Sequence, residues 1–364
     1  MKLFFLSLVI SNVAFAQMTL PSVFPDMRSV NPAVIALRKS GQIKLGGQTD
    51  KIEKEQKVNT INGGSFVYTD NSDINLNNAN FFRGGKGGGL TSELYVDATT
   101  GKRESTITDA SQNISTFTTD VSSTYANFSF GGGNGGLRWG LGTHHVSYKS
   151  KYDFNIAVNG SSSSSSVENT ITVTGVRPGI ILGSPSFSLG LYFQYDTLTS
   201  KMKSDQPVTS TGTPKNIKYV GVGLGTGGVN GLLEVAVEAD PFTKQEKDQA
   251  TGDTPPSPMK VSLLAERRFG KLVLGYKGMY YKGNYMDYDQ IIQNQLIYRN
   301  MVDDARISHI FNFAYGGDKG FSLGVSGGVS NIKNKEKSSI YSSSEKHDTT
   351  TKSVSMGARI GYVY

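Results

Sequence analysis

The chain has 364 residues, of which 37 are Lys or Arg and 30 are Asp or Glu, giving a formal net charge of +7 at pH 7. Charges of both signs are mixed along the chain without a basic block or a base-stacking motif, which argues against a nucleic-acid-binding protein. The chain has no cysteine, so it forms neither a disulfide nor a lipoprotein anchor. No segment approaches eighteen consecutive apolar residues, which excludes a membrane-spanning helix.

Residues 1–16 have the pattern of a secretory signal peptide. One early cation, Lys2, is followed by a short apolar stretch and an Ala14-Phe15-Ala16 cleavage site. The stretch is too short, and too interrupted by Ser11 and Asn12, to span a membrane as a helix. We therefore expect an exported protein.

The segment 17–40 is irregular but apolar. Its three prolines exclude a regular strand through most of its length. Its apolar side chains, among them Phe24, Val34 and Ile35, are too numerous for a free tail. We expect this segment to pack against another part of the protein.

From residue 41 onward, the chain repeatedly alternates apolar residues with small or polar ones. In one such segment Leu233, Val235 and Val237 oppose Glu234 and Glu238. Neighbouring side chains of a strand point to opposite sides, so each segment separates an oily environment from a wet one. One such pattern is weak, but its recurrence predicts about fourteen transmembrane strands. We expect them near 41–50, 56–69, 88–98, 121–131, 136–149, 168–183, 186–198, 216–227, 230–240, 259–269, 271–283, 306–316, 319–331 and 352–364.

The connections between these segments fall into two classes. Short Gly-rich turns, such as 131–136 and 227–231, alternate with long polar loops, such as 150–167, 241–258 and 332–351. Glycine and asparagine supply the positive φ that tight hairpins need. Short periplasmic turns and long outer loops are typical of outer-membrane barrels. With an even number of strands, both ends of the barrel lie on the periplasmic side.

The last strand is apolar on one face, with Ile360, Tyr362 and Tyr364, and small or polar on the other, with Arg359 and Gly361. It resembles the terminal strand of bacterial outer-membrane β-barrels, which the barrel assembly machinery reads. The resemblance implies that Ile360, Tyr362 and Tyr364 form the assembly signal. The alternative is the last strand of a soluble sandwich, which would not explain the other segments.

Asn31-Pro32-Ala33, placed just before the first strand, looks like the end of the hatch in the FadL-type long-chain fatty acid transporter family. In that family an Asn-Pro-Ala motif leads into the first strand of a fourteen-stranded barrel. The resemblance implies that 17–40 is a hatch-like segment inside the barrel. Alternatively, Asn31-Pro32 only ends a turn that leads into the first strand. The residues that would form the hatch and the ligand path are Phe24, Asn31, Pro32, Ala33, Val34, Ile35 and Leu37.

The sequence thus predicts an all-β fold: a transmembrane antiparallel β-barrel of about fourteen strands over 41–364, with a short N-terminal luminal hatch segment. A barrel of this size is wider than eight-stranded barrels, whose side chains fill the interior, so an inner segment is expected. Charges of both signs face the lumen, where they line a solute path or pair with one another. The lumen-facing candidates are Glu93, Arg138, His144, Glu234, Glu238, Lys277 and Arg359.

The histidines do not suggest catalysis. His144 and His145 are adjacent, so on a strand they face opposite sides and do not converge on one metal ion. We expect them at the polar rim, near the outer end of their strand. No Ser, His and carboxylate occur in a recognisable order. We therefore expect no catalytic residue, no metal, no cofactor and no enzymatic activity.

The resemblance implies passive uptake of hydrophobic or amphipathic small molecules, such as long-chain fatty acids, across the bacterial outer membrane. Two alternatives remain open: a general polar-solute porin, and a structural or surface-interaction barrel with no transport role. The expected partners are the outer-membrane bilayer, the barrel assembly machinery and a small hydrophobic ligand. We expect a monomer that binds no nucleic acid.

Overall fold

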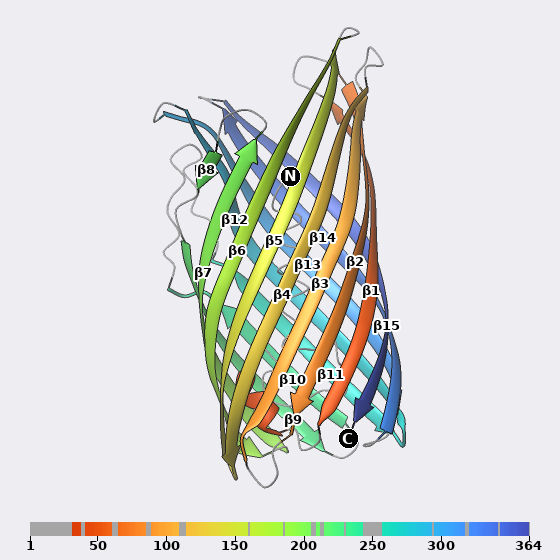
Figure 1. Ribbon diagram of the computed structural model, residues 1–364, viewed down its shortest axis with the longest axis vertical. Helices are drawn as coiled ribbons and strands as arrows, with labels where there is room; N and C mark the ends of the chain where they lie inside the picture. Colours follow the sequence, from red (N-terminus) through yellow and green to blue (C-terminus); the bar gives the residue numbers. More distant parts are fainter. Residues whose placement is uncertain are drawn as a thin grey trace.

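In the computed structural model, one antiparallel sheet of fifteen strands closes on itself, because β6 pairs with β7 at the two ends of the strand order. The strand β8 (Thr209–Thr211) pairs with β7 only in the part of the chain described here, which leaves fourteen strands around the wall (Figure 1). The structure describes residues 31–37, 41–59, 65–84, 89–108, 114–158, 161–184, 186–204, 209–211, 215–228, 231–242, 257–292, 295–316, 320–340 and 343–363.

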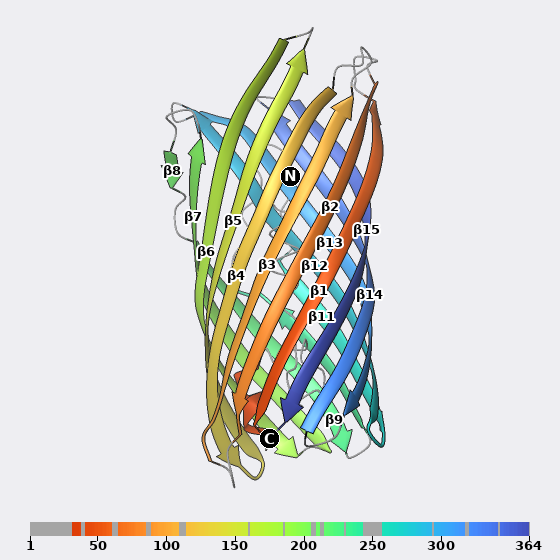
Figure 2. The same ribbon diagram turned by 45° about the vertical axis from the view of Figure 1, so that its right-hand side comes forward.

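The strands of the wall are joined in chain order, and β1 closes the barrel against β15 (Figure 2). They are β1 (Gln42–Asn59), β2 (Ser65–Arg83), β3 (Thr91–Thr108), β4 (Ile114–Asn134), β5 (Leu137–Val158), β6 (Ser161–Ser184), β7 (Phe187–Ser204), β9 (Lys215–Gly228), β10 (Gly231–Ala239), β11 (Met259–Phe269), β12 (Leu272–Ile292), β13 (Gln295–Gly316), β14 (Gly320–Ile340) and β15 (Ser343–Val363).

Side chains alternate between the inside and the outside of this wall. On β10, Glu234 and Ala236 are buried whereas Leu233, Val235 and Val237 are exposed. The same alternation leaves large apolar side chains exposed around the barrel, a continuous surface that is costly in water and favourable in lipid. The fold is that of an outer-membrane β-barrel.

The terminal strand presents its apolar face outward. Ile360 and Tyr362 are 47% and 44% exposed, and Gly361 between them is buried. The ring of Tyr362 lies 5.1 Å from that of Phe321 on β14, centroid to centroid. Tyr364 lies outside the described residues. This is the orientation that a role in assembly requires of Ile360 and Tyr362.

The prediction of a second strand at 56–69 is wrong. β1 continues to Asn59 and β2 begins at Ser65, so the predicted strand spans the end of one and the start of the next. Within a lipid belt one face of a strand must be apolar, but beyond it both faces are wet. The apolar alternation therefore fades while the strand continues.

Most of the predicted long loops are, for the same reason, extensions of the strands. The run Ser161–Ser166 belongs to β6 and pairs with Asp153–Val158 of β5. Backbone hydrogen bonds hold such polar ladders together. Lys151 bonds to Asp153 here, with nitrogen and oxygen 3.0 Å apart, and this hydrogen bond lowers the pKa of the Asp153 carboxyl.

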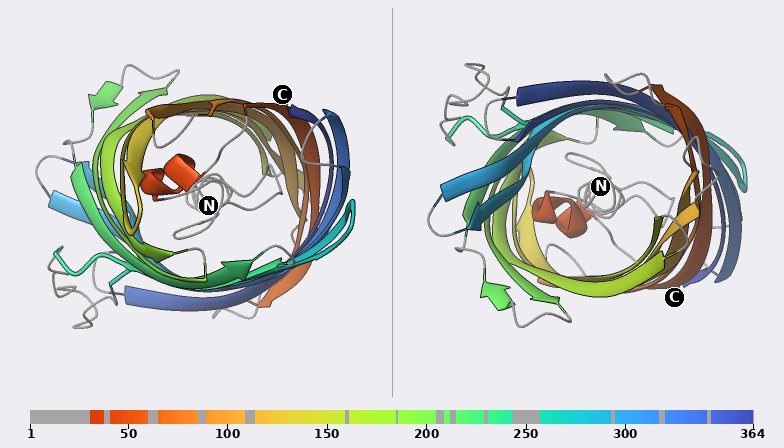
Figure 3. Two further views of the ribbon diagram at one scale, coloured as in Figure 1. Left: turned by 90° about the horizontal axis from the view of Figure 1, so that it is seen from below. Right: turned by 90° about the horizontal axis from the view of Figure 1, so that it is seen from above.

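The short connections gather at the end of the barrel where β15 also ends (Figure 1). The glycines with positive φ at these connections include Gly133 (116°), Gly183 (104°) and Gly270 (60°). Side chains rarely adopt this backbone, so glycine is the natural residue there. The helix η1 (Pro32–Leu37), a 3₁₀-helix, lies inside the barrel near this end (Figure 3). Among the described residues, no helix is long and apolar enough to cross a membrane.

Candidate solute path inside the barrel

A row of glycines on the inner wall forms the surface on which η1 packs, which we call the glycine seat. Gly131 on β4 lies directly opposite Gly140 on β5, which in turn lies opposite Gly179 on β6. All three are buried and face inward. A methyl group at Gly140 would collide with the backbone of Pro32 and Ala33. The absence of side chains along this row lets η1 lie directly on the strands.

The helix η1 is packed tightly onto this seat. Ala33, Val34 and Ile35 are fully buried, and Ala33 and Val34 pack with Ile181 of β6 and with Leu37. η1 contacts β4, β5 and β6 (Figure 3). Burying a large aliphatic side chain is worth about 1.5–3 kcal/mol. The apolar residues that follow Asn31 therefore hold the chain against the inner wall.

Asn31 ties η1 to the seam between two strands. Its side-chain Nδ2 donates hydrogen bonds to the carbonyl oxygens of Ile180 on β6, at 3.0 Å, and of Leu191 on β7, at 3.3 Å. Its Oδ1 accepts a hydrogen bond from the Ala33 backbone N–H at 3.0 Å, as an N-cap does. Pro32 is suited to the first helical position, where no N–H is needed. The Asn-Pro pair thus both begins the helix and fixes it to the wall.

The pairing of β6 with β7 is interrupted one row away from Asn31. Backbone pairs run as far as Val176 with Tyr195 and resume at Gly179 with Tyr192. Pro178 lies in this gap and has no N–H to donate. The side chain of Arg177 crosses the gap instead, with its Nε donating to Gln194 Oε1 at 2.9 Å. Side chains therefore close the wall where the backbone does not.

A polar layer lies beside η1, on the side away from the short turns. His144 Nε2 lies 3.1 Å from Asp196 Oδ1, and both side chains are buried. Gln194 Nε2 donates to Asp196 Oδ2 at 2.5 Å. The ring of Tyr125 stacks on the imidazole of His144, with centroids 6.1 Å apart. The Arg177–Gln194 hydrogen bond continues this network toward β6.

The network continues along the wall at the level of the glycine row. The guanidinium of Arg177 lies 5.8 Å from the ring centroid of Tyr192, which packs over Gly221. The Tyr192 hydroxyl hydrogen-bonds Glu238, whose Oε2 lies 2.5 Å from Lys260 Nζ. Glu238 and Lys260 are therefore paired with each other, as buried charges require.

An apolar patch lies next to the polar layer, further from the short turns. Tyr125, Val146, Val173 and Leu198 are directly opposite one another across β4, β5, β6 and β7. Tyr95 of β3 joins them, with its ring 6.1 Å from that of Tyr125. Except for the half-buried Leu198, these side chains are buried. We call Tyr95, Tyr125, Val146, Val173 and Leu198 the tyrosine patch.

The inner wall of β10–β15 carries further polar and charged side chains. Among its buried inward side chains are Glu234, Lys260 and Lys277. Arg359 Nη2 donates to Asn312 Oδ1 at 3.0 Å, and Arg306 Nε donates to Ser308 Oγ at 3.1 Å. Buried charged and apolar side chains therefore occur on both sides of the lumen, with Glu93 and Asp97 on β3, and Leu264 and Val273 on β11 and β12.

The predicted lumen-facing residues lie on the inward side of the described strands. Glu93, His144, Glu234 and Lys277 are buried, and Glu238 and Arg359 are half-buried. Glu93 accepts a hydrogen bond from Asn80 Nδ2 at 2.8 Å. Arg138 lies close to the short turns and donates to the Gly183 carbonyl at 3.3 Å. The predicted path residues Asn31, Pro32, Ala33, Val34, Ile35 and Leu37 lie in or beside η1, and Phe24 lies outside the described residues.

The placement of the two histidines at the polar rim is wrong for His144. It is buried in the lumen, because β5 continues to Val158 instead of ending near residue 149. His145 faces outward, and its Nδ1 lies 3.0 Å from Thr174 Oγ1. In the described part of the chain, no three His, Asp or Glu side chains are arranged to hold a metal ion.

The sequence interpretation missed the glycine row and the tyrosine patch. Both are relations between strands, so they appear only once the register is known. A signal was nevertheless present: Gly131, Gly140 and Gly179 all fall on the inward parity of their strands. Glycine at such a position marks a close approach of another backbone.

No family model and no curated protein sequence matches the chain. Solved structures do match it. The Pseudomonas putida toluene transporter TodX is 10% identical at a TM-score of 0.53, with 96% of this chain and 95% of that chain covered. A Pseudomonas aeruginosa FadL homologue is 10% identical at a TM-score of 0.54, with 92% of each chain covered. The chain therefore has the FadL-type outer-membrane barrel fold.

Proposed function

We propose that this protein lets hydrophobic or amphipathic small molecules, such as long-chain fatty acids, cross the bacterial outer membrane passively. The tyrosine patch carries this proposal. A lumen used only by polar solutes has no need of Tyr95, Tyr125, Val146 and Val173 clustered on its inner wall. An apolar surface with a few polar groups beside it is what such a ligand requires. TodX is described as a toluene transporter, and its barrel resembles this one.

In this proposal η1 is the end of a hatch-like segment. It lies against the wall near the short turns, and the polar layer of His144, Asp196 and Arg177 separates it from the tyrosine patch. A solute entering from the long-loop end would meet the tyrosine patch before the polar layer. An amphipathic solute would place its apolar part on the tyrosine patch and its polar end toward Arg177 and Gln194.

Uptake into liposomes that contain the purified protein tests the proposal. Val146→Thr together with Val173→Thr keeps the shape of the patch but adds two hydroxyl groups. We expect uptake of radiolabelled oleate to fall several-fold, with the rate for a neutral sugar unchanged. Val273→Thr is the matched control, because Val273 is equally buried and faces inward on β12, outside the patch. Equal oleate uptake by the patch variant and the control would contradict the proposal.

The buried charges on the inner wall of β10–β15 favour a second candidate, a porin for polar solutes. Glu234, Lys260 and Lys277 are buried on that wall. The same liposomes distinguish the two functions. Rapid passage of the sugar, together with oleate uptake no faster than in protein-free liposomes, would support the porin.

A further inference from the structure

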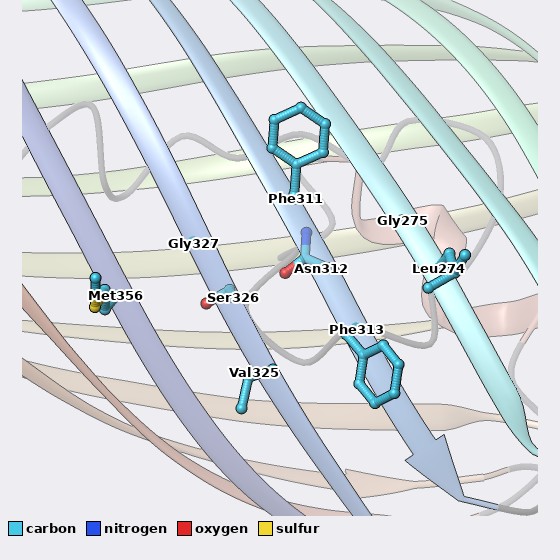
Figure 4. Close-up of a pocket in the computed structure, with 9 residues that line it drawn as sticks. All are labelled: Leu274, Gly275, Phe311, Asn312, Phe313, Val325, Ser326, Gly327 and Met356. Carbon is cyan, nitrogen blue, oxygen red and sulfur yellow. The ribbon is translucent and has the colours of Figure 1, made fainter.

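The outward face of β12–β15 carries an apolar groove of about 530 Å³ (Figure 4). The side chains that flank it point away from the lumen and are exposed: Leu274, Phe311, Phe313, Val325 and Met356. The neighbouring inward residue Asn312 is buried on the other side of the wall. The groove therefore faces the medium that surrounds the barrel.

Gly327 is the reason for the groove. It lies directly opposite Phe311 on β13 and Met356 on β15. The outward residues beside it on β14 are Val325 and Val329, which are 56% and 52% exposed. A Cβ at Gly327 would have no heavy atom within 4 Å. The backbone thus has no steric need for glycine here, and the missing side chain leaves a slot between two large apolar residues.

A polar pair, His309 and Tyr276, lies at the end of the groove that is further from the short turns. Two residues along β13 from Phe311, His309 also faces outward, and its Nδ1 lies 2.9 Å from the Tyr276 hydroxyl. The two rings are stacked, with centroids 6.1 Å apart. A hydrogen-bonded His–Tyr pair on a lipid-facing surface can offer a donor to a polar group at the edge of the bilayer.

Two lysines lie beyond this pair on the same outward face. Lys282 on β12 and Lys333 on β14 are both directly opposite Ala305 of β13, one on each side, and both are exposed. The row is six residues from Phe311, or about 20 Å along the strand.

We propose that this surface binds one phosphorylated lipid of the surrounding bilayer. One hydrocarbon chain lies in the groove over Gly327, between Phe311 and Met356. The phosphate lies between Lys282 and Lys333, where two cations match its charge. Between the groove and the lysines, the hydrocarbon chain passes His309, which lies four residues from Ala305 on β13. The site is on the outside of the wall, so it is independent of what passes through the lumen.

Photo-crosslinking in nanodiscs tests the lipid site. The probe is phosphatidylglycerol with a diazirine in one acyl chain, compared with the phosphatidylcholine analogue, and the adducts are mapped by mass spectrometry. We expect phosphatidylglycerol adducts to concentrate at Phe311, Phe313 and Met356, well above those at Leu233 and Val237 of β10, which are also lipid-exposed. Phosphatidylcholine should label the groove less.

Three variants separate the groove from the lysines. Gly327→Leu fills the slot and should reduce labelling to the level seen on β10. Val235→Leu is the matched control on the lipid face of β10 and should change nothing. The double variant Lys282→Gln with Lys333→Gln should abolish the preference for phosphatidylglycerol over phosphatidylcholine. We expect each lysine to contribute a factor of roughly five to this preference. Heat-modifiability on gels confirms that each variant is a folded barrel.

Two results would overturn the lipid site. One is labelling spread evenly around the barrel, or labelling of the groove that Gly327→Leu leaves unchanged. The other is disulfide cross-linking between two copies through Gly327→Cys in nanodiscs, which would assign the groove to an interface between barrels. Neither result bears on oleate uptake through the lumen, so a failure here is distinct from a failure of the proposed function.

Discussion

Asn31 fixes η1 to the wall through two side-chain hydrogen bonds to strand carbonyls and one from Ala33. Asn31→Asp has almost the same size and keeps the acceptor for Ala33, but it loses both donors and places a charge against two carbonyl oxygens. We expect η1 to be held more weakly by about 1–3 kcal/mol. Hydrogen–deuterium exchange of residues 31–37 should therefore accelerate, with exchange of the barrel strands unchanged.

Asn331→Ala is the control for that experiment, because Asn331 is an exposed outward residue on β14. It should leave exchange of residues 31–37 as in the wild type. Unchanged exchange in Asn31→Asp would mean that the apolar side chains alone hold η1, and that the Asn–strand hydrogen bonds are dispensable.

Gly140 makes a second prediction at the residue scale. Gly140→Ala places a methyl group against the backbone of Pro32 and Ala33, where no flexible side chain can yield. We expect η1 to be displaced while the barrel still assembles, because the methyl points into the lumen. A cysteine at Val34 should then react faster with a maleimide than it does in the Gly140 background. Gly136→Ala is the control, since a Cβ there meets nothing within 4 Å.

At the scale of the element, the sequence predicts strands well only where they lie within the apolar belt. The predicted strand at 259–269 coincides with β11, whereas 56–69 spans the end of β1 and the start of β2. Lipid requires β11 to have an apolar face, but no such requirement acts on residues 56–69, where both faces of the strand contact water. The apolar belt therefore allows the number of strands to be predicted from the sequence, but not their length.

The candidate site is predictable only in part, for a related reason. Asn31 and Pro32 stand out in the sequence because turn-forming residues occur next to an apolar run. The tyrosine patch does not, because Tyr125 and Val173 meet only through the register of three strands. Register depends on turn lengths and on pairing across long ladders, which alternation within one strand does not specify.

The segment before the barrel, residues 17–40, is the subject of a functional prediction. Deletion of residues 18–34 removes Asn31 and the first part of η1, and so removes the hydrogen bonds to β6 and β7. If the segment obstructs the lumen, single-channel conductance in planar bilayers should rise, with the barrel still heat-modifiable. The glycine seat would also become accessible to solutes. Unchanged conductance would show that the segment does not plug, and would favour the porin or a structural role.

For the whole molecule, an even number of strands places both ends of the barrel on the same side of the membrane. Fourteen strands around the wall bring the end of β15 to the end of the barrel that carries the short turns. Outer-membrane barrels keep their short turns in the periplasm. Both ends of the barrel, and η1 with them, should then lie near the periplasm, and the strand extensions such as Ser161–Ser166 should project from the cell.

Single cysteines test this topology directly, because the chain has none of its own. Ser163→Cys lies on the extended β5–β6 hairpin, and Gly136→Cys lies in a short turn; both positions are exposed. A membrane-impermeant maleimide added to intact cells should label Ser163→Cys and leave Gly136→Cys unlabelled until the outer membrane is permeabilised. Labelling of Gly136→Cys alone on intact cells would mean that the barrel has the opposite orientation in the membrane. A solute from outside would then meet η1 before the tyrosine patch, and the path proposed here would run in the opposite order.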